Sequence, residues 1–175
     1  MRSRRRRGIR YNTRGTVITQ SVGHKTRWII RKFANDEDHA ANKPFETAEV
    51  KGNILVNTGI NLMWDLVTAA GGQGFDNANA YLGVGADNTA AQATDTDLIG
   101  GTAVRVGMNG GYPTSATQKV TFQSDFGSAV GNIAWEEFGV FNAAAAGTML
   151  NRKCSAQGTK TAGQTWELTL EITLS

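Results

Sequence analysis

The most regular hydrophobic pattern lies at the end of the chain, in the segment GQTWELTLEITLS over residues 163–175. Apolar side chains occupy every second position from Trp166 to Leu174, and Thr and Glu alternate with them. Because successive side chains of a β-strand point to opposite faces, this pattern predicts a strand with one apolar and one polar face. We expect the polar face to contact solvent or a polar partner, and a second layer to cover the apolar face.

Other strand-like segments follow one another along the chain. They are residues 25–33, 45–50, 54–56, 79–85, 102–108, 118–126, 132–142 and 148–154. Polar or Gly-rich stretches separate them: residues 35–43 are predicted to be a loop or one helical turn, and residues 109–113 a turn-rich link. Gly139 indicates a bulge or a close backbone approach within its strand. Short strands at regular spacing are typical of sandwiches and barrels. We therefore predict an all-β protein, an antiparallel β-sandwich that is jelly-roll-like.

One segment has a helical pattern instead. Its apolar residues fall at i, i+3, i+4 and i+7: Ile60, Met63, Trp64 and Val67. Asn57 or Thr58 can cap the first turn, and a Gly pair follows the end. The pattern predicts the one short α-helix of the fold, over about residues 59–70, which covers one end of the sheet with Met63 and Trp64 in the core.

Charge is divided unevenly along the chain. Residues 1–32 hold 11 of the 18 Lys and Arg residues and none of the 15 Asp and Glu residues, whereas residues 33–175 hold 7 basic and 15 acidic residues, a net charge of −8. We interpret residues 1–24 as an extended, Arg-rich arm and residues 25–175 as the sandwich domain. The arginines of the arm are Arg2, Arg4, Arg5, Arg6, Arg7, Arg10 and Arg14. Such an arm favours a negative partner, either a protein groove or nucleic acid; a solvated tail is the third interpretation.

The residue types that usually carry catalysis or bind metals are sparse. His24 and His39 lie in polar segments, and Cys154 is the single cysteine. Since neither a nucleophile–His arrangement nor metal-ligand spacing of Cys and His is present, we expect no enzyme, no cofactor and no zinc site. Four aspartates lack the spacing of a calcium loop, so no metal site is predicted there: Asp76, Asp87, Asp95 and Asp97. The Gly-Val-Gly of residues 83–85 is interpreted as a strand that ends in a turn.

Adjacent carboxylates indicate a buried ion pair. Glu136 and Glu137 are neighbours in a predicted strand, so one of them points inward or into an interface. A buried carboxylate needs a partner, and Arg105, Arg152 and Lys153 are the candidates.

Several ordered motifs resemble a family of small structural proteins of tailed bacteriophages. They are KPFETAEVKGNILVNTGINLMWDL (43–66), FDNANAYLGVGADNTAA (75–91), TDL (96–98), IAWEEFGVFN (133–142), MLNRK (149–153) and GTKTAGQTWELTLEITLS (158–175). Each motif is weak by itself, and their number and order make the resemblance specific. It spans most of residues 28–175, whereas the Arg-rich residues 1–22 extend beyond it.

The resemblance implies a virion component, made in the host cytoplasm and assembled into a particle. We expect a non-enzymatic capsid decoration or cement protein that binds the major capsid protein through its arm and forms homo-oligomers. A tail, neck or baseplate adaptor is the alternative. A nucleic-acid-binding protein and a glycan-binding module are further hypotheses. No apolar run reaches about 18 residues, so no membrane association is expected.

Overall fold

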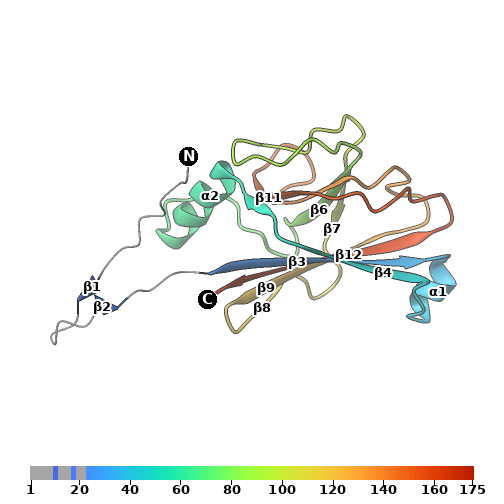
Figure 1. Ribbon diagram of the computed structural model, residues 1–175, viewed down its shortest axis with the longest axis horizontal. Coiled ribbons are helices and arrows are strands. Elements are labelled where there is room, and N and C mark those ends of the chain that lie inside the picture. The colour runs from blue at the N-terminus through green and yellow to red at the C-terminus, as the bar shows by residue number, and fades with distance from the viewer. Residues whose placement is uncertain (1–9, 12–16, 19–22) are drawn as a thin grey trace.

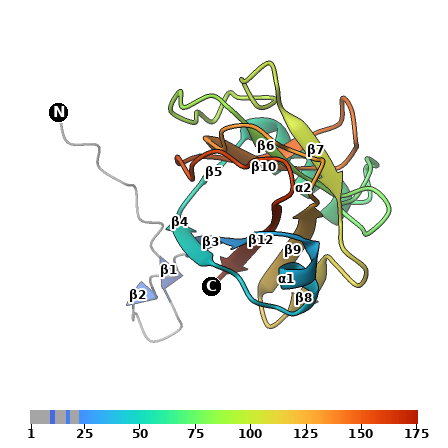
Figure 2. The ribbon, with the colours of Figure 1, turned by 90° about the vertical axis from the view of Figure 1, so that its right-hand side faces the viewer.

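Two antiparallel sheets of five strands form the body of the protein (Figures 1 and 2). The computed structural model describes residues 10–11, 17–18 and 23–175. The all-β antiparallel sandwich predicted from the sequence is confirmed. A pair of two-residue strands, β1 (Arg10–Tyr11) and β2 (Val17–Ile18), lies apart from the body, in the basic arm.

The first sheet, here called the β12 sheet, has the order β4-β3-β12-β9-β8. Its strands are β3 (His24–Phe33), β4 (Glu46–Lys51), β8 (Thr114–Ala116), β9 (Lys119–Phe126) and β12 (Thr165–Leu174). The regular C-terminal strand β12 is the central one. Trp166, Leu168 and Leu170 point inward from it, as their alternation predicts.

The second sheet, here called the β10 sheet, has the order β5-β11-β10-β6-β7. Its strands are β5 (Ile54–Leu55), β6 (Tyr81–Gly85), β7 (Val104–Gly107), β10 (Glu137–Phe141) and β11 (Met149–Cys154). Consecutive strands form hairpins within a sheet at β3–β4, β6–β7, β8–β9 and β10–β11.

The core between the sheets is rich in aromatic side chains. Trp135 lies at its centre, with ring centroids 4.8 Å from Phe126, 4.9 Å from Trp166 and 6.2 Å from Phe138. Its indole N–H donates to the Gly131 carbonyl at 3.0 Å, so the one polar atom of the side chain is satisfied. Burial of these rings supplies the main apolar contribution to folding.

The polar face of β12 is less exposed than its sequence suggests. Thr165, Glu167 and Thr169 point away from the core, but they are only 2%, 8% and 7% exposed. Side chains of the flanking strands cover them: Arg31 of β3 donates to Glu167 at 3.2 Å, and Gln123 of β9 donates to Thr169 at 3.2 Å. Polar side chains of the flanking strands therefore take the place of solvent along most of this face.

Several element boundaries differ from the prediction. The structure has two helices among the described residues where the fold prediction counted one: the segment predicted as a loop or one helical turn forms the short helix α1 (Asp36–Ala40), capped by the Asn35 side chain. Strand β10 begins at Glu137, and the residues before it form a loop with one isolated bridge from Ala134. The close backbone approach expected at Gly139 is observed, since a Cβ added to this residue would lie 3.1 Å from the Asn151 carbonyl oxygen.

Helix α2 (Asn57–Val67) has the predicted position but a different orientation. Its N-cap is Val56, without a side-chain cap, so the prediction of Asn57 or Thr58 was wrong. Its buried residues are Gly59 and Leu62. Trp64 is 64% exposed, so its predicted place in the core was also wrong. The reason is Gly59, whose missing side chain lets this face of the helix rest directly on the β11 backbone.

Gly59→Ala is expected to lower the free energy of unfolding by about 1–3 kcal/mol. A Cβ here would lie 2.6 Å from the Leu150 Cα and carbonyl oxygen, and backbone cannot give way as a flexible side chain can. The gain in helix propensity from Gly to Ala, about 1 kcal/mol, offsets only part of this cost. Urea unfolding measures the change. Gly74→Ala is the control, because nothing lies within 4 Å of its added Cβ; equal stability of the two variants would contradict this packing.

Candidate functional site

Two oppositely charged side chains lie fully buried in the β10 sheet. Glu137 of β10 and Arg152 of β11 are both 0% exposed. Arg152 Nε donates to Glu137 Oε2 at 2.8 Å, and its Nη2 lies 2.8 Å from the same oxygen. Arg152 Nη1 donates to Asp95 Oδ2 at 2.9 Å. Because a buried charge is costly without a partner, Glu137 and Asp95 both depend on Arg152, and we call these three residues the buried triad.

The triad fastens the long segment of residues 86–103 onto the sheet. The backbone N–H groups of Ile99 and Gly100 donate to Glu137 at 3.1 and 2.8 Å. Burial alone would lower the pKa of Arg152, but hydrogen bonds to Asp95 and Glu137 outweigh burial and raise that pKa, so the guanidinium stays charged. Both carboxylate oxygens of Glu137 accept hydrogen bonds. Arg152 Nη2, by contrast, is buried and makes no hydrogen bond within the described residues, so the guanidinium is held through its Nε and Nη1 atoms.

Of the residues predicted for a buried ion pair, the structure brings together Glu137 and Arg152. Glu136 is half-buried and lies outside the triad, with its backbone N–H donating to the Gly85 carbonyl at 2.9 Å. Arg105 pairs instead with Asp97 at 2.7 Å, and its guanidinium carbon lies 3.5 Å from the centroid of the Phe141 ring. Sequence reasoning missed Asp95, because it precedes Arg152 by 57 residues and no local pattern links them.

The Gly-Val-Gly of residues 83–85 belongs to β6, as the sequence analysis favoured. A Cβ on Gly85 would lie 2.4 Å from Glu137 Oε1, and a Cβ on Gly100 would lie 3.1 Å from the same atom. Because these two glycines have no side chains, there is room between them for the Glu137 carboxylate.

The four aspartates considered for calcium serve separate turns. Asp76 accepts hydrogen bonds from the backbone of Ala78 and Asn79, and Asp87 accepts one from Thr89. Asp95 and Asp97 bind the two arginines described above. Each carboxylate thus has a local role in closing a turn or pairing a charge.

One group of metal-ligating side chains lies within 4.8 Å in the part of the chain that the structure describes: His39, Asp125 and Glu167. His39 Nε2 lies 3.4 Å from Asp125 Oδ2, and its ring packs edge-on against Phe33. Arg31 already binds Glu167 at 3.2 Å. The cluster fastens α1 onto the outer face of the β12 sheet. The other histidine, His24, begins β3 and is exposed.

A ladder of charges crosses the outer face of the β12 sheet. Glu171 of β12 accepts from Arg27 Nε of β3 and from Lys119 Nζ of β9, both at 2.9 Å. Arg27 also lies 3.3 Å from Glu49 of β4. The hydrogen bond from Arg27, opposed by burial and assisted by Lys119, lowers the pKa of Glu171 below its usual value. The four charges of this ladder therefore balance one another, and the ladder ties four strands together.

Glu171→Gln is expected to lower stability at neutral pH by about 0.5–1 kcal/mol, since Glu171 joins two partly exposed pairs. The folded-state pKa of Glu171 lies below the unfolded one, so its contribution is present above about pH 4.5 and is lost as pH falls through the folded value. The variant should therefore lose less stability than wild type between about pH 5 and 3. Urea unfolding across this range measures it, with the exposed Glu49→Gln as control. Parallel pH profiles for wild type and Glu171→Gln would contradict the prediction.

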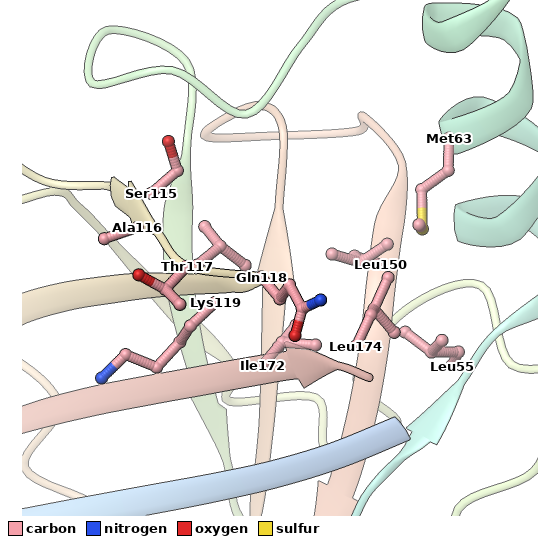
Figure 3. A pocket seen from close by; sticks show the side chains of 11 residues that line it. Leu55, Met63, Ser115, Ala116, Thr117, Gln118, Lys119, Leu150, Ile172 and Leu174 are labelled. Carbon is pink, nitrogen blue, oxygen red and sulfur yellow. The ribbon is translucent and has the colours of Figure 1, made fainter. Parts of the chain in front are cut away.

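An open apolar groove lies at the end of the sandwich where the arm begins (Figure 3). It has a volume of about 520 Å³. Leu55 of β5 and Met63 of α2 line one side, the β8–β9 turn lines the other, and Leu150, Ile172 and Leu174 lie between them. Gly23 and Ser175 exchange backbone hydrogen bonds beside this groove. The arm and the C-terminus are thus joined at one end of the molecule.

The predicted partner-binding arginines belong to the arm. Arg10 lies in strand β1, and the other six fall outside the residues that the structure describes: Arg2, Arg4, Arg5, Arg6, Arg7 and Arg14. The groove beside Gly23 was not predicted. Its signal in the sequence was the apolar stripe of residues 60–67, which sequence reasoning assigned to the core.

Comparisons with protein-family models, with curated proteins and with solved structures find no match to this chain. A search of the described residues finds no helix with the length and apolar character that a membrane crossing needs.

Proposed function

We propose that this chain is a non-enzymatic structural protein of a tailed-phage particle, a decoration or cement protein that binds the major capsid shell through its Arg-rich arm. The division of charge carries the proposal. Seven arginines lie within the first 14 residues, whereas residues 33–175 have a net charge of −8. An arm of this composition is suited to an acidic groove on a neighbouring protein, where Arg pairs with carboxylates in a bidentate manner.

The body supports the same proposal. Two of its fully buried charges, Glu137 and Arg152, neutralise each other and fasten a loop. A ladder of charges on its outer sheet is paired across strands. A body of this kind is suited to covering a surface, while the arm provides the attachment. Many symmetric copies on a shell would raise the effective concentration of each weak contact.

The sequence resemblance supports the virion setting. The motifs with the most specific order include residues 43–66, 133–142 and 158–175. In the fold these motifs contain Gly59, where α2 packs on β11, Glu137 of the buried triad, and the central strand β12. The shared motifs thus correspond to the framework of the sandwich, and the arm is an addition to it.

The experiment is to purify particles of the phage that carries the gene and detect this chain by mass spectrometry. The chain should remain with the particles through gradient purification and nuclease treatment. Host cytosolic proteins in the same fractions serve as the control for carry-over. If the chain is found only in the unassembled fraction, a virion role is wrong.

A further inference from the structure

Helix α2 presents an apolar surface to solvent. Trp64 is 64% exposed, Val67 73% and Leu66 39%, and Ile60 beside them is half-buried. Ile60, Trp64 and Val67 lie at i, i+4 and i+7, on one face of the helix, and we call these three residues the α2 stripe. A contiguous apolar surface that includes a Trp is typical of an interaction site, because Trp is enriched among the residues that dominate binding energy.

The α2 stripe adjoins the apolar groove. Met63 lies on the same helix and points into the groove, opposite the β8–β9 turn (Figure 3). Leu174, which is 38% exposed, lies at the far end of the β12 strand and lines the same groove. Stripe and groove together offer one apolar surface with a concave part, which suits a short segment with bulky aliphatic or aromatic side chains.

The charge of α2 favours a basic occupant. Its one charged residue is the exposed Asp65, and the lysine that lines the groove, Lys119, is paired with Glu171. The last turn of α2 has no basic residue, so the negative end of its dipole is not balanced from within the helix. An occupant with both apolar and cationic side chains complements these features.

Residues 10–18 of the arm have this composition. They include Arg10 and Arg14 together with Tyr11, Val17 and Ile18, and no acidic residue. The arm leaves the body at Gly23, which is hydrogen-bonded to Ser175 next to the groove residue Leu174. Within one chain, β1 and β2 lie apart from α2 in both views (Figures 1 and 2).

We propose that residues 10–18 of one copy bind the α2 stripe and the adjoining groove of a second copy. The aliphatic and aromatic side chains of the segment cover the stripe, and its arginines lie near Asp65 and the C-terminal end of α2. Residues 18–23 span at most about 18 Å, so the two bodies lie close together. This contact leaves Arg2 to Arg7 for another partner, and it does not depend on the proposed virion role.

The test uses two full-length variants that each lose one half of the contact. Trp64→Ser removes the centre of the α2 stripe, and the double variant Val17→Ser/Ile18→Ser removes the apolar part of the segment. Sedimentation velocity is measured for wild type, for each variant and for their equimolar mixture. Phe45→Ser is the matched control, because Phe45 is 54% exposed and lies outside both stripe and groove.

Wild type and Phe45→Ser should self-associate, and each contact variant should do so at least tenfold more weakly. The equimolar mixture should recover dimers, since the intact segment of the Trp64→Ser chain can bind the intact stripe of the double variant. A monomeric wild type, contact variants that associate as wild type does, or a mixture that stays monomeric while wild type associates would each overturn the proposal. Unfolding midpoints of all variants confirm that the bodies are folded.

Discussion

Replacing Arg152 with Met lowers the free energy of unfolding by about 3–5 kcal/mol. The substitution leaves the Glu137 carboxylate buried and without its cation, and it also removes the partner of Asp95. The loop of residues 86–103 is fastened to the Glu137 carboxylate through the amides of Ile99 and Gly100. We therefore expect this loop to detach from the sheet when the triad is broken. Urea unfolding gives the free energy, and hydrogen exchange of the Gly100 amide reports the loop.

Two matched variants distinguish the cost of leaving a buried charge without a partner from the cost of losing a surface charge. Arg27→Met breaks an exposed pair and should cost about 1 kcal/mol or less. Glu137→Gln combined with Arg152→Met removes the uncompensated charge while an amide oxygen still accepts from Gly100, so it should recover part of the lost stability. The account is contradicted if Arg152→Met is no more destabilised than Arg27→Met.

Deleting residues 1–22 lowers the affinity of the chain for capsid shells by about 100-fold or more. In the proposed function the arm provides the attachment, so its deletion leaves only the weak contacts of the covering body and forfeits the gain in effective concentration from linking them to the arm. The body should stay folded, because the described sandwich begins at Gly23. Co-sedimentation with shells that lack this chain measures the binding.

Deleting residues 1–7 is the matched control for the two roles assigned to the arm. It removes five of the seven arginines and keeps residues 10–18. Shell binding should fall nearly as far as with the full deletion, whereas self-association should persist. Shell binding at the wild-type level after the full deletion would show that the body alone carries the attachment.

The sequence predicted the strands with clear alternation. In β12 every second side chain is apolar, and in β9 the same alternation is interrupted only by Ser124; both strands were placed within two residues of their observed ends. The short strand β8 was missed, because Pro113 and the Gly residues before it indicate a turn and only three residues of strand follow. Local patterns of two or three residues do not distinguish an edge strand from a link.

The candidate site was harder to predict, for two physical reasons. The stripe of Ile60, Trp64 and Val67 showed where a helix lies but not which side faces the core; Gly59, with no side chain, decided that. The triad needed Asp95, which is brought to Arg152 by the long loop of residues 86–103 and not by any local spacing. Glu137 was foreseeable because adjacent carboxylates on a strand must face opposite ways.

The copy number of this chain in purified virions tests the central claim most directly. Quantitative mass spectrometry against the major capsid protein gives the ratio. A decoration or cement protein predicts a ratio between one to one and one to a few, that is, hundreds of copies in each particle. A handful of copies per particle would contradict that role and assign the chain to the tail, neck or baseplate.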